Sequence, residues 1–269
     1  MKLTLGFSPC PNDTFIFDAL VHHKIDTEGL EFKVFLGDVE QLNKWALDGK
    51  LDATKLSYHA FTYCVNEYAL LDSGSALGNN CGPVLIKKPE IILTSQSKIA
   101  IPGKYTTANM LFGIAFSKYQ NTVETVFSDI EDDVMQEKVE AGLIIHENRF
   151  TYSDKGLEKV KDLGEFWEEE TQLPLPLGGI VMKRVFPLAI QQKLERVLRK
   201  SVEYAFKHPN KSADYVQLHA QTMEKEVAEA HIKLYVNDYS VSLGRRGRKA
   251  VEMVFEKVGK DSASVFVES

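Results

Sequence analysis

Short apolar runs alternate with helical patterns over about the first 185 residues, and this alternation is the strongest constraint on the fold. Runs such as Leu3–Phe7 and Ala53–Leu56 are typical of buried strands. Segments such as Thr14–His23 and Val39–Leu47 carry apolar residues at three- and four-residue steps, as amphipathic helices do. The last third of the chain is a succession of helical patterns. We therefore predict an α/β fold with a largely parallel sheet.

The remaining predicted elements follow the same two patterns. Further strands are predicted at Phe32–Leu36, Ala69–Leu71, Pro83–Ile86, Lys98–Ile101, Val123–Phe127, Gly142–Ile145 and Gly179–Met182. Further helices are predicted at Thr107–Phe116, Ile130–Val139 and Ile190–Phe206.

The length of 269 residues suits one large or two ordinary domains. A weak internal echo favours two, because Lys50–Thr54 and Lys138–Gly142 have similar sequences and each leads from a helix into an apolar strand. A proline-rich stretch at residues 174–179 is suited to a stiff crossover. We predict a larger, discontinuous lobe of residues 1–91 and 178–269, a smaller lobe of residues 92–177, and a central cleft.

The composition is that of a globular protein, with 44% hydrophobic and 26% charged residues. The formal net charge of −6 gives no general attraction to phosphate backbones or anionic lipids, so any anion site must be local. We therefore expect no nucleic-acid partner. The sequence neither indicates nor excludes a homodimer.

The first residues, Met1–Phe7, lead directly into a strand and lack the basic, apolar and small-residue regions of a signal peptide. No window has the ~18 uninterrupted apolar residues that a membrane span needs. The 3 cysteines are odd in number and lack CxxC spacing, which argues against a disulfide framework and a zinc knuckle. We expect a cytoplasmic protein without membrane insertion.

Polar residues follow four of the predicted strands at their carboxyl ends, where ligands bind in open α/β sheets. The four clusters are residues 8–14 (SPCPNDT), residues 57–59 (SYH), residues 103–107 (GKYTT) and residues 146–147 (HE). In the first cluster, Asn12 or Asp13 is expected to cap the following helix. We predict that the four clusters face one cleft and that Asn12 and Asp13 help to bind the substrate.

Several of these residues also have a purely structural interpretation. Thr106 and Thr107 suit an ordinary helix N-cap, although the same helix start favours a carboxylate. The Ser57 hydroxyl can serve a backbone group at the strand end or a ligand. Lys55 interrupts an apolar strand, so it lies either on a solvated edge or beside a ligand anion.

His146 directly follows the apolar run Gly142–Ile145, which predicts a position at the end of a buried strand. The ordinary pKa of histidine suits proton transfer near neutral pH, so a general base is one interpretation and a non-catalytic histidine the other. Glu147 and Arg149 either orient the imidazole or form a surface ion pair of little energy.

Other chemistry has less support. Cys10 precedes a helix, where thiol pKa values fall, but buried structural cysteines are commoner. The remaining histidines lack metal-ligand spacing, and the chain has neither GxGxxG nor GxxxxGK[ST], so we predict no metal and no cofactor. The basic run Gly244–Lys249 opens the last helix and is expected to lie on a solvated face.

Together, five segments resemble the 1,4-dihydroxy-6-naphthoate synthase family of menaquinone biosynthesis. They are residues 8–17 (SPCPNDTFIF), 54–58 (TKLSY), 142–147 (GLIIHE), 173–178 (LPLPLG) and 235–237 (YVN). Each segment alone is a weak signal, but the combination is specific and extends over essentially the whole chain.

The resemblance implies a two-lobed fold of the type II periplasmic-binding-protein class that closes on a small anionic substrate, cyclic dehypoxanthine futalosine. It implies a lyase step without metal or organic cofactor. The catalytic base of the family corresponds to His146, and its ligand-binding positions correspond to Lys55, Ser57, Thr106 and Thr107.

Two other functions stay open on the sequence. Chorismate dehydratase has the same fold and acts on another anion, although residues 8–13 (SPCPND) favour the naphthoate synthase. A solute-binding protein that feeds a transporter is the alternative outside the enzymes, and it requires export or a lipid anchor.

Overall fold

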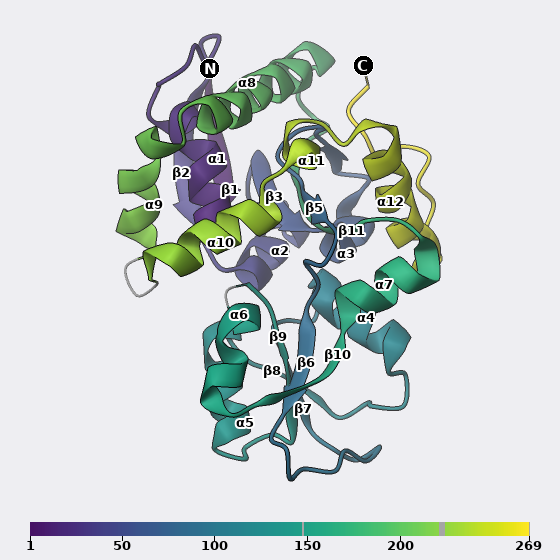
Figure 1. Cartoon of the computed structure of the whole chain (residues 1–269). Coiled ribbons are helices and arrows are strands. Elements are labelled where there is room, and N and C mark those ends of the chain that lie inside the picture. The colour runs from purple at the N-terminus through teal and green to yellow at the C-terminus, as the bar shows by residue number, and fades with distance from the viewer. Residues whose placement is uncertain (147, 221–223, 269) are drawn as a thin grey trace. The chain divides into compact units, whose positions relative to one another are not determined.

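The computed structural model describes residues 1–146, 148–220 and 224–268. The chain divides into two compact units (Figure 1). The first unit comprises Met1–Gly78 and Pro176–Ser269, and the second comprises Asn79–Leu175.

The sheet of the first unit has the strand order β2-β1-β3-β11-β4, with β5 paired to β11. Its strands are β1 (Lys2–Phe7), β2 (Glu31–Leu36), β3 (Ala53–Ser57), β4 (Tyr68–Leu70), β5 (Ala76–Gly78) and β11 (Leu175–Lys183). β1 runs parallel to β2 and β3, whereas β11 is antiparallel to β3 and β4.

The helices of the first unit come from both ends of the chain. They are α1 (Pro11–Val21), α2 (Val39–Leu47), α3 (Tyr58–Cys64), α8 (Leu188–Lys207), α9 (Ala213–His219), α10 (Lys225–Tyr235), α11 (Asp238–Val241) and α12 (Gly244–Lys257). α1 is buried from Pro11 to Leu20 and contacts α8, α9 and α10. Ser201 of α8 is fully buried, and its hydroxyl donates to the carbonyl of Ile16 over 2.6 Å. This bond satisfies a polar group inside an otherwise apolar contact.

The second unit has a five-stranded sheet of order β10-β6-β9-β7-β8. Its strands are β6 (Val84–Lys87), β7 (Ile99–Ile101), β8 (Thr122–Glu124), β9 (Ala141–Ile144) and β10 (Glu158–Asp162), and its helices are α4 (Thr107–Ala115), α5 (Ile130–Met135), α6 (Asn148–Thr151) and α7 (Leu163–Thr171). A Cβ at Gly142 would lie 2.4 Å from Ile130 Cγ2, so glycine lets α5 pack directly on β9.

The α/β class is confirmed, but the largely parallel sheet is wrong, because both sheets are mixed. β6 pairs antiparallel with β9 and β10, and β11 pairs antiparallel with β3. These are strands at which the chain passes from one unit to the other, and each enters its sheet against the direction of its neighbour.

Two of the observed strands, β5 and β10, lack a sequence pattern that predicts them. β5 has only three residues, Ala76–Gly78, too few to show an alternation. β10 reads Glu-Lys-Val-Lys-Asp and lies at the edge of its sheet, where charged side chains are tolerated. Two predicted elements are too long, because β8 ends at Glu124 and α5 ends at Met135.

The first crossing between the units lies earlier than predicted, after Gly78 instead of near residue 91. β6 belongs to the sheet of the second unit because it pairs with β9 and β10. The return, at Leu175 and Pro176, is close to the predicted residue 178.

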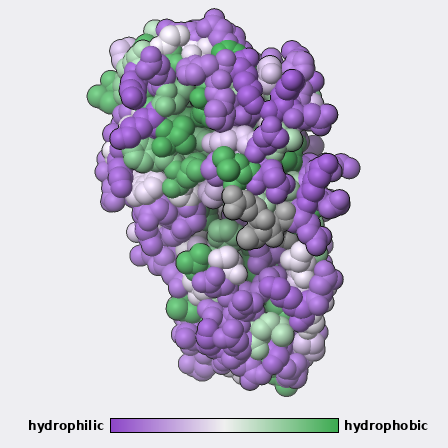
Figure 2. All heavy atoms as spheres, turned by 90° about the vertical axis from the view of Figure 1, so that its left-hand side faces the viewer, coloured by the Kyte–Doolittle hydropathy of each residue, from purple (hydrophilic) through white to green (hydrophobic). Residues whose placement is uncertain are grey.

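The face drawn in Figure 2 is largely hydrophilic, and its hydrophobic spheres gather in a few places. Cys10, Cys64 and Cys81 are buried free thiols. No helix in the described parts of the chain is both long and apolar enough to cross a membrane.

Candidate functional site

In the first unit, two of the predicted polar clusters lie at one edge of the sheet. β1 runs parallel to β3, with Gly6 opposite Thr54. The carboxyl ends of these neighbouring strands therefore meet at the same edge, where β1 continues into Ser8 and β3 ends at Ser57. This edge is where parallel strands of α/β proteins present ligand-binding groups.

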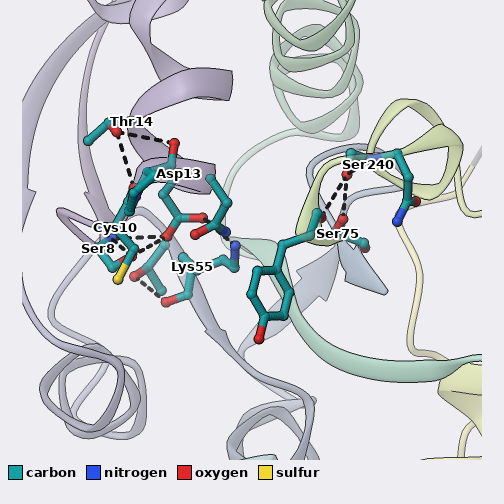
Figure 3. A network of polar contacts seen from close by, with 12 residues as sticks. Ser8, Cys10, Asp13, Thr14, Lys55, Ser75 and Ser240 are labelled. Atoms are coloured by element: carbon teal, nitrogen blue, oxygen red, sulfur yellow. Dashed lines mark hydrogen bonds and ion pairs between the residues drawn. The ribbon is translucent and has the colours of Figure 1, made fainter. Parts of the chain in front are cut away.

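Ser8, Asn12, Asp13 and Lys55 form one hydrogen-bonded group, which we call the Asp13 cluster (Figure 3). Lys55 Nζ donates to Asp13 Oδ1 over 2.5 Å, and the two side chains are 11% and 2% exposed. Asp13 Oδ2 accepts from the Ser8 hydroxyl at 2.7 Å and from the Ser8 backbone N–H at 3.1 Å. A buried carboxylate with these donors is held in one orientation.

The alternative that Lys55 lies on a solvated edge is wrong, because β3 lies between β1 and β11 in the sheet. Lys55 instead forms a buried ion pair with Asp13. A Cβ at Gly178 would be 3.4 Å from Lys55 Cε and 2.8 Å from the Leu56 carbonyl oxygen. Glycine in β11 therefore leaves room for the lysine stem beside the strand.

The helix cap predicted for Asn12 or Asp13 is also wrong. α1 begins at Pro11 and Cys10 occupies the N-cap position, so both residues lie in the first turn. Proline at the first helical position explains this start, because its fixed φ suits a helix and its missing N–H costs nothing there. Asp13 remains close enough to the helix start for its negative charge to be favourable.

Ser57 is held by a residue that the sequence did not single out. Asn43 Oδ1 accepts from the Ser57 backbone N–H over 2.8 Å, and Asn43 Nδ2 donates to Ser57 Oγ over 3.1 Å and to Glu40 Oε2 over 3.0 Å. The Ser57 hydroxyl therefore serves an amide side chain rather than the backbone. Because its oxygen accepts this bond, its own hydrogen is still available to donate to a ligand.

A second polar group of the first unit surrounds Tyr58. Its hydroxyl bonds the Ser75 hydroxyl at 2.7 Å. Ser240 Oγ donates to the Ser75 carbonyl at 2.9 Å (Figure 3). Burial raises the pKa of Tyr58 well above its ordinary value. Tyr58 therefore carries a neutral hydroxyl that links the start of α3 to the segment between β4 and β5, which is a structural role.

In the second unit, the other two polar clusters also meet at one sheet edge, since β7 runs parallel to β9 with Ala100 opposite Gly142. Thr106 is the N-cap of α4, as its structural interpretation predicts. Its Oγ1 accepts from the Asn109 backbone N–H at 3.1 Å and donates to the Gly103 carbonyl at 2.8 Å. Thr107 is the first residue of α4 and is 2% exposed.

His146 lies in a turn directly after β9 and is half-buried. Its φ of 59° is in the left-handed region. Residues other than glycine rarely adopt this backbone conformation, and those that do are often found at functional sites. The Phe127 ring meets the imidazole edge-on, with centroids 4.9 Å apart and an interplanar angle of 66°. We call Ile145 and His146 the histidine turn.

Arg149 follows the histidine turn and is part of a buried ion pair, not a surface one. Its Nη2 lies 3.2 Å from Asp162 Oδ2, with side chains 13% and 7% exposed, and its Nη1 donates to the Gly82 carbonyl. The Asp162 carboxylate also caps α7 by accepting from the Gly164 and Glu165 backbone N–H groups. Glu147, the other predicted partner of His146, lies outside the described residues.

The described residues contain no group of three His, Cys, Asp or Glu side chains placed to hold a metal ion. Cys10 is buried at the start of α1. The basic run of residues 244–249 opens α12, where Arg248 is only partly exposed and donates to Asp72 at 2.9 Å and 3.1 Å. Arg245, Arg246 and Lys249 are exposed, as expected for a solvated face, whereas Arg248 has Asp72 as a structural partner.

Comparison with solved structures identifies the fold. A protein from Archaeoglobus fulgidus superposes with a TM-score of 0.91 at 34% identity, over 96% of this chain and 97% of that chain. The alkanesulfonate-binding protein from Xanthomonas axonopodis pv. citri, solved with bound MOPS, superposes with a TM-score of 0.68 at 11% identity, over 99% and 96% of the two chains. The fold is therefore that of the periplasmic-binding-protein class.

Sequence comparison identifies the family. A family model described as menaquinone biosynthesis matches residues 3–260. The 1,4-dihydroxy-6-naphthoate synthase of Thermus thermophilus is 45% identical over 253 residues, which are 94% of this chain and 92% of that protein. The enzyme of the same name from Streptomyces coelicolor is 39% identical over 254 residues, 93% and 90% of the two chains. The chain belongs to the 1,4-dihydroxy-6-naphthoate synthase family, lyases of menaquinone biosynthesis.

Proposed function

We propose that this enzyme converts cyclic dehypoxanthine futalosine to 1,4-dihydroxy-6-naphthoate, with His146 as the general base. The observation that carries the proposal is the near full-length identity of 45% to a synthase of that name. The position of His146, directly after a buried strand in a left-handed turn, supports its role.

The proposed chemistry begins with removal of a carbon-bound proton by a neutral imidazole. General-base catalysis of this kind contributes typically ~10²- to 10⁴-fold to the rate. The edge-on contact with Phe127 limits how the ring can turn, so the imidazole meets the substrate in a narrow range of orientations. Loss of the proton leads to release of the naphthoate and of a fragment derived from the sugar.

Substrate binding is proposed for the Asp13 cluster, Ser57 and the start of α4. The hydrogen bond to Asp13 uses one of the three N–H donors of Lys55, and Ser57 has a hydroxyl hydrogen to donate. Both suit a carboxylate oxygen. Thr106 uses its hydroxyl within the cap, so we assign its contribution, and that of Thr107, to the helix start, whose backbone N–H groups favour an anion.

We also propose that the reaction takes place in the cytoplasm and needs no metal or organic cofactor. Buried free thiols suit a reducing compartment. Cell fractionation checks the location, and recovery of the protein mainly from a periplasmic or membrane fraction would instead favour a solute-binding role.

The direct test is incubation of the purified protein with cyclic dehypoxanthine futalosine while the naphthoate product is followed by chromatography. Chorismate serves as the alternative substrate, and a parallel reaction contains a chelator. We expect naphthoate from the first substrate only, at the same rate with the chelator. Turnover of chorismate alone would overturn the proposed function, and loss of activity with the chelator would overturn the absence of a metal.

A further inference from the structure

Asn12 carries a hydrogen-bonding group that the described residues of the protein leave unused. The residue lies in the first turn of α1 and is 7% exposed. Its Nδ2 donates to Asp13 Oδ1 over 2.9 Å. Within the part of the chain that the structure describes, its Oδ1 is buried and has no hydrogen-bond partner.

The direction of this amide is fixed by chemistry. Asp13 Oδ1 accepts from Lys55 Nζ, and Oδ2 accepts from the Ser8 hydroxyl and backbone N–H, so both oxygens of this carboxylate act as acceptors. The amide must therefore turn its NH₂ group toward Asp13, because the opposite orientation would place two acceptor oxygens against each other. The Asn12 oxygen consequently points away from Asp13 as an acceptor.

A buried acceptor without a donor is uncommon, because most buried polar atoms have a partner in the protein or in bound ligand or water. The remainder of the Asp13 cluster is satisfied, with bonds from Ser8, Asn12 and Lys55 to one carboxylate. The protein thus builds a rigid support for Asn12 and leaves one of its atoms for something else.

We propose that Asn12 Oδ1 accepts a hydrogen bond from a hydroxyl group of the substrate, which makes Asn12 a residue that determines specificity. This inference rests on the proposed function. A carboxylate cannot donate, and a cationic donor would be repelled by Lys55, whose Nζ bonds the same Asp13 oxygen as the Asn12 amide. A neutral O–H is the group that fits.

The hydroxyl has two sources, the hydroxyls of the naphthoate ring system and those of the sugar-derived part. Both offer the same O–H chemistry to Asn12. Ligands that contain only the ring system separate them, because they lack the sugar hydroxyls.

The test uses Asn12→Leu, which has a similar shape and no acceptor, with Asn121→Leu, an exposed residue of the second unit, as the matched control. Calorimetry gives the Kd of 1,4-dihydroxy-6-naphthoate and of naphthalene-2-carboxylate, which lacks both hydroxyls, and steady-state kinetics give KM for cyclic dehypoxanthine futalosine. Both ligands carry a carboxylate, but only the first carries hydroxyls. An indirect effect of the mutation through Asp13 and Lys55 would therefore weaken both ligands, whereas loss of the Asn12 acceptor would weaken only the first.

If Asn12 binds a ring hydroxyl, Asn12→Leu should raise the Kd of the dihydroxy ligand roughly 10- to 100-fold and leave the Kd of naphthalene-2-carboxylate unchanged. If Asn12 instead binds a sugar hydroxyl, the Kd values of both naphthoates should be unchanged, and the KM for cyclic dehypoxanthine futalosine should rise by the same factor. Asn12→Ala, checked by thermal unfolding, replaces the leucine variant if that variant does not fold.

Unchanged Kd and KM in a folded variant would overturn the role of Asn12 while the wild type still turns over its substrate. Equal weakening of both naphthoates would also overturn it, since the effect would then pass through Asp13 and Lys55. Failure of the wild type to form naphthoate would overturn the proposed function itself.

Discussion

The two sheet edges of this enzyme are built on the same pattern but hold their side chains differently. In each unit, neighbouring parallel strands bring two polar segments together. The Asp13 cluster is buried and tied by an ion pair, whereas the histidine turn is half-buried and strained at φ 59°. Rigid, charged support suits binding of an anion, and a reactive imidazole in a strained turn suits proton transfer.

In the proposed function the Asp13 cluster binds the substrate and the histidine turn carries out the proton transfer, so mutations at these two places should have different kinetic signatures. Loss of a proton-transfer group lowers kcat, whereas loss of a ground-state contact raises KM.

The largest effect is expected for His146→Gln, which keeps hydrogen-bonding capacity but cannot act as a base. We expect kcat to fall by about 10²- to 10⁴-fold with little change in KM. Steady-state kinetics measure this, with thermal unfolding as the check on the fold. A variant with near wild-type kcat would remove the assignment of chemistry to the histidine turn.

Lys55→Met is expected to affect both binding and stability, because it leaves the Asp13 carboxylate buried without its cation. Breaking such a pair costs about 3–5 kcal/mol of unfolding free energy, measured by urea denaturation. The matched control is the double variant Lys55→Met/Asp13→Asn, which removes both charges. It should regain most of the stability but keep a raised KM, and recovery of KM would show that Lys55 does not bind the substrate.

Arg149→Lys tests whether the segment after His146 must be held in place. Lysine cannot bond Asp162 and the Gly82 carbonyl with one planar group, so the position of the histidine turn should change. We expect kcat to fall by about 10- to 100-fold with KM nearly unchanged. Lys138→Ala, which removes an exposed ion pair with Asp133, should cost at most ~1 kcal/mol and no activity. A fall in stability without a fall in kcat would make Arg149 purely structural.

The smallest effect is expected at Glu28, which belongs to the first unit but not to the Asp13 cluster. Hydrogen bonds from Arg196 and Lys200 lower the pKa of Glu28 from 4.5 to about 2. A lowered pKa in the folded state stabilises the protein above pH 4.5, and this contribution is lost as the pH falls toward about 2.

Glu28→Gln should therefore be slightly less stable than the wild type at neutral pH, with a difference that disappears in acid. The effect is small because Arg196 and Lys200 are about half exposed. Denaturation at several pH values measures it. An altered KM would contradict the proposal that binding is limited to the Asp13 cluster, Ser57 and the start of α4.

Much of the fold was predictable because buried strands and amphipathic helices leave strong local patterns, as in β1 and α2. The direction of the strands was not predictable from the sequence, since the antiparallel strands β6 and β11 have the same apolar character as the parallel strands. The charged edge strand β10 has no pattern that separates it from a loop.

The candidate site was predictable where a polar residue directly follows an apolar strand, as for Ser57 and His146. The residues that hydrogen-bond these site residues were not predictable, because the bonded partners are far apart in sequence. Asn43 bonds Ser57 across 14 positions and Asp13 bonds Lys55 across 42. The N-cap at Thr106 was predictable because a helix cap depends only on residues that are close in sequence.

The position of β11 has a consequence for biosynthesis. It lies between β3 and β4 and also pairs with β5, so the sheet of the first unit stays divided until residues 175–183 have been made. Every strand of the second unit precedes these residues in the chain. On the ribosome, the second unit can therefore fold while the first still exposes unpaired strand edges, although the first unit contains the N-terminus. Chaperone protection during synthesis should be needed most by the unit that begins the chain.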